Sequence, residues 1–306
     1  MFFSMPAGQL EVRVLNKEYD VVRRTMNQVS GHKIKRPKFS EILKQVQKRR
    51  LEPQGTIFVI DFTGDTHASG VPALAREITA VLETATPEDE VVVRLESPGG
   101  VVHGYGLATA QLERIKQANV KLTVCIDKVA ASGGYMMACV ADKVVAAPLA
   151  IVGSIGVIAE LPNIHKLLNR AGIEYEQIVA GAYKRPLSIF AENTPEGREK
   201  YQEQISRTFE LFRQHVQKYR SIKDFDKVAD GHVFYGQEAL GKNLIDMIET
   251  SESLISRLTK TNRVVAVKWN EPVNMMQRLG LAASVVTEAV ATKLLAITAQ
   301  EHRFIR

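Results

Sequence analysis

Apolar residues in the middle of the chain follow two alternating patterns. Short runs rich in β-branched and aromatic residues predict buried strands at 56–62, 90–97, 121–127 and 142–148. The segments between these runs repeat apolar residues at helical spacing, which predicts helices at 71–85, 104–118 and 133–141. Strands that alternate with helices indicate an α/β fold with a mostly parallel sheet and right-handed crossovers.

Beyond residue 160 the pattern becomes more helical. A helix is expected at 162–172, with Gly172 suited to its C-terminal cap, and a further strand at 173–181. Thr194 and Pro195 are suited to the N-cap and first position of a long helix that ends near residue 220. Apolar residues at 279–299 also recur at roughly helical spacing, which predicts a helical tail.

The positive charge of the chain is concentrated at its N-terminus. The formal net charge is +6, but residues 1–50 hold twelve Lys and Arg against four Asp and Glu, a net +8. We therefore divide the chain into a basic N-terminal arm (1–54), a main domain (55–260) and a C-terminal strand with a helical tail (261–306). Such an arm is typical of contact with anionic lipid or nucleic acid, although a solvated linker is the commoner explanation.

Two further features limit the classes of function. Cys125 and Cys139 lie in apolar surroundings without metal-ligand spacing, so we interpret them as buried small hydrophobic residues. No run of about eighteen uncharged apolar residues occurs, so the sequence predicts no transmembrane helix.

Two predicted strands end in glycine pairs, within LESPGGVVHGYG (95–106) and VAASGGYMM (129–137). Ligands collect at the carboxyl ends of parallel strands. The N–H groups of Gly133, directly after Ser132, and of Gly100 in the other turn would together form an oxyanion hole. The alternative is purely structural, with glycines that shape a turn and Ser132 as a helix cap.

A nucleophilic serine requires a base. None of the seven histidines stands in a recognisable triad pattern, although His103 lies beside the first glycine pair. Lys184 lies in a loop flanked by glycine and proline, in VAGAYKRPLS (179–188). From its spacing alone, a solvated loop lysine is the simpler interpretation of Lys184.

Five motifs together indicate a family. In chain order they are RLESPGG, KVAASGGYMMACVADK, IVGSIGV, AGAYKR and ENTPEGREKY. In this order and spacing, over about residues 55–255, the chain resembles the signal peptide peptidase A family of Ser/Lys proteases, in particular its SohB branch. The resemblance implies a ClpP/crotonase-like α/β fold, a spiral of ββα units, here with an N-terminal basic arm and a C-terminal helical tail.

The same resemblance implies roles for five residues. Ser132 matches the nucleophile, Lys184 the general base and Ser154 the hydroxyl that orients the base, while Gly100 and Gly133 match the oxyanion positions. The implied reaction is peptide-bond hydrolysis through an acyl-enzyme, without metal, nucleotide or other cofactor. A lysine must be neutral to accept a proton, and burial favours the neutral form.

The family also implies partners. Neighbouring subunits of a homo-oligomeric ring share active sites, so Lys184 is expected to serve Ser132 of another copy. A membrane span precedes a basic segment like residues 9–50 in SohB-type proteins, which implies association with the bacterial inner membrane and no nucleic-acid partner. The implied substrates are remnant signal peptides or other membrane-associated polypeptides.

Three rival functions are compatible with such a turn. A caseinolytic-type Ser/His/Asp peptidase would place its histidine about one helix beyond the serine, a region that Val157 and Ile158 occupy. A crotonase-type acyl-CoA hydratase or isomerase would bind a thioester enolate and need carboxylates near the turn. A non-catalytic scaffold of the same fold would not need Ser132, Ser154 and Lys184 together.

Overall fold

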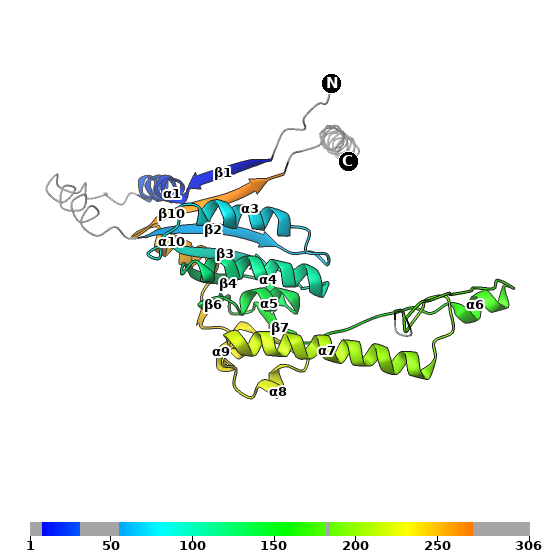
Figure 1. Ribbon diagram of the computed structural model, residues 1–306. Coiled ribbons are helices and arrows are strands. Elements are labelled where there is room, and N and C mark those ends of the chain that lie inside the picture. The colour runs from blue at the N-terminus through cyan, green and yellow to red at the C-terminus, as the bar shows by residue number, and fades with distance from the viewer. Residues whose placement is uncertain (1–7, 31–54, 182–183, 272–306) are drawn as a thin grey trace, which may run out of the picture. The chain divides into compact units, whose positions relative to one another are not determined.

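The computed structural model describes residues 8–30, 55–181 and 184–271, and residues Val12–Lys268 form one compact unit (Figure 1). The strands are β1 (Gln9–Val14), β2 (Thr56–Thr63), β3 (Glu90–Glu96), β4 (Lys121–Ile126), β5 (Val129–Ala131), β6 (Lys143–Ala146), β7 (Ile151–Gly153), β8 (Val233–Tyr235), β9 (Met247–Ile248) and β10 (Arg263–Asn270). The helices are α1 (Leu15–Val29), α3 (Val71–Leu82), α4 (Val102–Gln117), α5 (Gly133–Ala138), α6 (His165–Arg170), α7 (Pro195–Tyr219), α8 (Phe225–Val228), α9 (Gly236–Gly241) and α10 (Ser251–Leu258).

The larger sheet has seven strands in the order β1-β10-β2-β3-β4-β6-β9. From β10 to β9 each neighbouring pair is parallel; Val59, for example, lies opposite Val92. Between consecutive parallel strands the chain passes through a helix, α3 after β2 and α4 after β3. The mixed α/β fold with a parallel sheet is therefore confirmed.

The sheet is buried on both faces. Ile60 and Val93 pack with residues of α3, α4 and α5, the helices that Figure 1 shows alongside β2, β3 and β4. On the other face Val59 and Val92 pack with Leu15 of α1 and with residues of α10. Because helices cover most of both faces, these strands appear in the sequence as largely apolar runs.

Two segments differ from the pattern-based expectation. The strand predicted at 173–181 is wrong, because this segment forms no strand and exposes Ile173, Tyr175 and Ile178. An alternating strand needs a neighbour to satisfy its backbone groups, and the described part of the chain supplies none. Residues 9–29, for which the sequence predicted no strand or helix and only a place in the basic arm, form β1 and α1.

The remaining expectations for the two ends of the chain fall on residues that the structure does not describe, including the tail at 279–299 and residues 31–54 of the arm. Among the described residues, no helix is both long enough and apolar enough to cross a membrane.

A smaller sheet, in the order β5-β7-β8, carries the glycine-rich segment that follows β4. Strand β5 pairs parallel with β7, and β7 pairs antiparallel with β8. A parallel bridge between Ser97 and Ala130 connects β5 to the end of β3 in the larger sheet. The turns after β3, β5 and β7 are thereby brought to one place.

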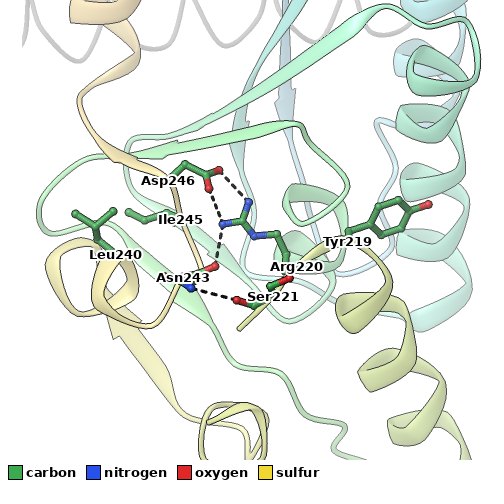
Figure 2. Close-up of a pocket in the computed structure, with 7 residues that line it drawn as sticks. All are labelled: Tyr219, Arg220, Ser221, Leu240, Asn243, Ile245 and Asp246. Carbon is green, nitrogen blue, oxygen red and sulfur yellow. Dashed lines mark hydrogen bonds and ion pairs between the residues drawn. The ribbon is translucent and has the colours of Figure 1, made fainter. Parts of the chain in front are cut away.

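A half-buried ion pair attaches the end of α7 to the segment before β9 (Figure 2). Arg220 donates from Nη1 to Asp246 Oδ2 (2.9 Å) and from Nη2 to Asp246 Oδ1 (3.0 Å), and Nη2 also donates to the carbonyl of Asn243 (2.8 Å). The Arg220 side chain is only 8% exposed. Nearby, the Tyr135 hydroxyl of α5 donates to the carbonyl of Leu244 (2.8 Å).

We expect Arg220→Ala to lower the free energy of unfolding by about 2–3 kcal/mol, because it leaves the Asp246 carboxylate without its charged partner and with the Val144 N–H as its remaining donor. The value lies at the low end for a broken buried pair, since Asp246 keeps contact with water. Urea unfolding at constant m-value measures the change. Lys121→Ala, which removes an exposed partner of Glu90, is the control and should change stability by less than about 1 kcal/mol. Equal effects of the two substitutions would contradict this prediction.

Candidate active site

Ser132 and Ser154 follow two strands that end side by side. In the parallel pairing of β5 with β7, Ala131 lies opposite Gly153, so the two serines are the next residues on neighbouring strands. The Ser132 N–H donates to the Gly153 carbonyl (2.8 Å), and the Ser154 N–H donates to the His232 carbonyl (2.7 Å). The two backbones are therefore about one strand spacing, roughly 5 Å, apart.

Both serines have an uncommon backbone conformation, with φ of 51° at Ser132 and 50° at Ser154. Positive φ is unfavourable for residues with a Cβ, and such strain is concentrated at functional sites. Ser132 occupies the N-cap position of α5, yet its side chain makes no capping hydrogen bond. The helix-cap interpretation of Ser132 is therefore wrong, and its half-buried hydroxyl is not used by the helix.

The turn after β3 lies directly against Ser132. Gly99 has φ of 89°, and a Cβ placed on it would be 2.7 Å from Ser132 Cβ and 2.8 Å from Gly133 N. The N–H groups of Gly100 and Gly133 donate no hydrogen bond to any described residue. Two free N–H groups thus lie in the segments that flank Ser132, an arrangement that can bind an oxyanion.

Lys184 is not joined to these residues. Its backbone N–H donates to the Gly181 carbonyl (3.1 Å), and its side chain is exposed. Within the described part of the chain, the Lys184 side chain makes no hydrogen bond or ion pair with Ser132 or Ser154. One copy of the chain therefore brings together four of the five predicted site residues.

The segment that carries Lys184 is stabilised by its own hydrogen bonds. The Asn163 side chain donates to the carbonyls of Ser188 (2.9 Å) and Ala191 (3.0 Å), and the Ile164 N–H donates to the Ile189 carbonyl (2.9 Å). Large apolar side chains of this segment are nevertheless exposed: Ile158, Leu167, Ile173, Ile178, Val179 and Phe190.

The histidine beside the glycine pair is not hydrogen-bonded to Ser132. The His103 side chain is exposed on α4 and makes no hydrogen bond with a described residue. A different histidine, His232, is linked to the site through a backbone hydrogen bond to Ser154, and the sequence analysis did not single it out. His232 precedes β8, its Nδ1 is 2.8 Å from Asp230 Oδ1, and its carbonyl accepts the Ser154 N–H. The only local feature of the sequence that suggests this pair is the Asp-Gly-His order of residues 230–232.

The two cysteines do not act as nucleophiles here. Both are free and buried, as expected. Burial raises the pKa of the Cys125 thiol to about 12 and raises the pKa of Cys139 further. A protonated, buried thiol is inert.

Comparison with known proteins identifies the family. Residues 4–112 match the model of the peptidase family S49 N-terminal region, and residues 114–265 match that of peptidase family S49. "Probable protease SohB" of Haemophilus influenzae is 46% identical over 243 residues, which span 79% of this chain and 69% of that protein. The protein of the same name from Buchnera aphidicola subsp. Schlechtendalia chinensis is 43% identical and covers 80% of this chain and 77% of its own length.

Among solved structures, a membrane-bound stomatin-specific protease mutant in complex with a substrate peptide is similar to 67% of this chain and 80% of that one, with 15% identity and a TM-score of 0.42. The peptidase family S49 model covers the segments around Ser132 and Ser154, and the N-terminal model covers the turn after β3. The chain therefore belongs to peptidase family S49, as a protease of the SohB type.

Proposed function

We propose that this protease is a serine endopeptidase with Ser132 as nucleophile, in a ClpP/crotonase-like spiral flanked by the basic arm and the C-terminal tail. One observation carries the proposal. Ser132 is held at φ of 51°, with its hydroxyl unused by α5, and the segments on either side of it present the N–H groups of Gly100 and Gly133, which no described residue accepts. A strained strand-to-helix turn that exposes a serine is also the geometry of nucleophile elbows in hydrolases.

The reaction would proceed through an acyl-enzyme. Ser132 Oγ attacks the carbonyl carbon of the scissile peptide bond while its proton passes to the neutral base. The carbonyl oxygen becomes an oxyanion that accepts hydrogen bonds from Gly100 N–H and Gly133 N–H. The protonated base then gives its proton to the leaving amine as the C–N bond breaks. Water hydrolyses the remaining ester, with the base accepting a proton from the water and returning it to Ser132 Oγ.

For the base we propose Lys184 of a neighbouring copy in a homo-oligomeric ring, with Ser154 orienting its amine. Lys184 is exposed and unpaired with Ser132 in its own chain, whereas its segment presents unpartnered apolar side chains, Ile158 at 86% and Ile178 at 89% exposure. The alternating sequence at 173–181 lacks a strand partner within the described chain. Both features support an intermolecular contact, because exposed apolar patches mark interaction sites.

The rivals are less well supported. The His232–Asp230 pair is an alternative base, but the His232 side chain is 75% exposed and makes no hydrogen bond to Ser132 among the residues described. For a crotonase-type acyl-CoA enzyme, the nearest carboxylate in the loop after β2 is Asp65. It is already bound by Ser69 Oγ and Ser69 N–H, interactions that lower its pKa and keep it charged. A scaffold would have no need of the strain at Ser132.

Labelling with a fluorophosphonate tests the proposal. This reagent is expected to modify wild-type protein at Ser132 and to leave Ser132→Ala unmodified, because it reacts only with an activated serine beside an oxyanion site. Peptide mapping of the adduct identifies the residue. Labelling at another serine, or unchanged labelling of Ser132→Ala, would refute the serine mechanism proposed here.

We further propose that the substrates are membrane-associated polypeptides and that the basic arm lies near an anionic lipid surface, at the bacterial inner membrane. In the described part of the arm, α1 exposes Val22, Met26 and Val29. Each Lys or Arg near such a surface contributes about 1 kcal/mol, and salt screens the attraction.

Flotation with anionic vesicles is therefore expected to recover the protein at low salt and to lose it at high salt. Replacement of Lys44, Lys48, Arg49 and Arg50 by serine should weaken binding. Substitution is preferable to deletion, because Leu15 of α1 belongs to the core. Neutral vesicles are the control. If binding to the vesicles changes neither with salt nor with the substitutions, the basic arm does not contact the lipid surface.

A further inference from the structure

A buried chain of hydrogen bonds runs from the turn after β3 to the loop after β2. Ser97 and Tyr105 are both completely buried. The Gly99 N–H donates to Ser97 Oγ (3.1 Å), Ser97 Oγ lies 2.5 Å from the Tyr105 hydroxyl, and this hydroxyl lies 2.8 Å from the Asp65 carbonyl.

The directions of these bonds follow from donor counting. The Asp65 carbonyl can only accept a hydrogen bond, so the Tyr105 hydroxyl donates its single hydrogen to it. Ser97 must therefore donate to the Tyr105 oxygen, and its own oxygen accepts from Gly99. Each donor is used once, and all bonds run in one direction, from Gly99 to Asp65.

The loop that ends this chain is itself well fixed. Asp65 accepts hydrogen bonds from the backbone N–H groups of His67 (3.1 Å) and Ser69 (2.9 Å). The adjacent Thr66 carbonyl accepts the Val101 N–H (2.8 Å), and a Cβ on Gly100 would lie 2.1 Å from it. The turn that contains Gly99 and Gly100 is thus held by the loop after β2 as well as by its contact with Ser132.

Tyr105 contacts both halves of the proposed oxyanion site. Its hydroxyl reaches Gly99 through Ser97, while its ring packs against Gly133, where an added Cβ would lie 2.3 Å from ring Cγ. Gly99 in turn touches Ser132 and Gly133. One side chain therefore sets the spacing between the turn after β3 and the start of α5.

We propose that Ser97 and Tyr105 are positioning residues that hold the Gly99–Gly100 turn against Ser132, so that the Gly100 N–H is aimed at the oxyanion. This inference rests on the proposed function, because it assigns a role within the same site. Neither side chain is expected to touch substrate, since both are fully buried. Their effect should therefore appear in the chemical step and not in substrate binding.

The central test is Tyr105→Phe, which keeps the ring against Gly133 and removes only the hydroxyl. Ser97 then loses its acceptor and the Asp65 carbonyl keeps only the Ala68 N–H (3.1 Å), so the turn loses its buried side-chain link to the loop after β2. We expect kcat to fall by about 10- to 100-fold, since a displaced oxyanion donor is costly to the transition state. KM should stay within about twofold of wild type, because binding contacts remain. Ser97→Ala should behave in the same way.

Tyr135→Phe is the matched control. Tyr135 is equally buried, and its hydroxyl also donates to a backbone carbonyl, that of Leu244 (2.8 Å), which is not part of the Gly99–Asp65 chain. If Tyr105 acted only through stability, the two Tyr→Phe variants would lose kcat to a similar extent. Thermal unfolding of all variants gives the accompanying change in stability.

A double-mutant cycle tests whether Ser97 and Tyr105 act as one unit. Because they belong to one hydrogen-bond chain, Ser97→Ala combined with Tyr105→Phe should lower kcat about as much as either change alone. Multiplicative losses would overturn the proposal, as would wild-type kcat in Tyr105→Phe or an equal loss in Tyr135→Phe. If Ser132→Ala keeps its activity, the proposed function itself fails and this inference with it. If Ser132→Ala is inactive and Tyr105→Phe is normal, only the positioning role fails.

Discussion

Replacing Ser132 by alanine is expected to abolish peptide hydrolysis, with turnover reduced by about four to six orders of magnitude, as for loss of other covalent nucleophiles. The fold should survive, because the Ser132 hydroxyl makes no capping bond to α5, and alanine and serine face similar strain at φ of 51°. Cleavage of an unstructured peptide, followed by mass spectrometry, measures the turnover.

Two controls accompany this measurement. Ser206→Ala changes an exposed serine on α7 and should keep wild-type activity. Circular dichroism and size-exclusion chromatography of Ser132→Ala should match those of wild type. Retention of most activity by folded Ser132→Ala would rule out Ser132 as the nucleophile.

The long periodic elements could be predicted from the sequence because their patterns reflect local burial. Strands β2, β3 and β4 are continuous apolar runs since both faces of the sheet are covered. Helix α7 begins at Pro195 as expected, with Thr194 Oγ1 accepting the Gly197 N–H (3.0 Å). The short strands β5 and β7 have three residues each, too few for a period to show.

The candidate site was only partly predictable for a related reason. Ser132 and Gly133 are adjacent in sequence, so their combination is visible without a structure. The chain from Gly99 to Asp65 depends on contact between Tyr105 and a loop forty residues earlier. The His232–Asp230 pair reaches Ser154 only through the pairing of β7 with β8. No local pattern encodes either contact, because both depend on which strands become neighbours.

The alternating residues at 173–181 show the opposite case, in which a correct local pattern gave a wrong element. Alternation predicts a strand only if a neighbouring strand satisfies its backbone. The described chain provides no such neighbour, and Ile178 remains exposed. In our proposal a second copy supplies the missing contact and receives Lys184 at its Ser132.

Lys184→Arg is the second change expected to abolish activity. Arginine keeps the positive charge but is effectively always protonated, so it cannot accept the proton of Ser132. Loss should therefore be comparable to that in Ser132→Ala, while assembly remains normal. Lys166→Arg, on α6 of the same segment, is the matched control and should retain activity. If Lys184→Arg is active, His232→Gln tests the alternative base held by Asp230.

Mixing two inactive variants tests whether the dyad forms between chains. Ser132→Ala supplies an intact Lys184, and Lys184→Ala supplies an intact Ser132. If each site takes its serine from one subunit and its lysine from the next around a ring, random exchange of equal amounts restores about a quarter of wild-type activity. If both groups come from one chain, every site stays defective and activity stays at background. Subunit exchange is verified by mass spectrometry of differently tagged copies, so that background activity after complete exchange would place the dyad within a single chain and contradict the intermolecular proposal.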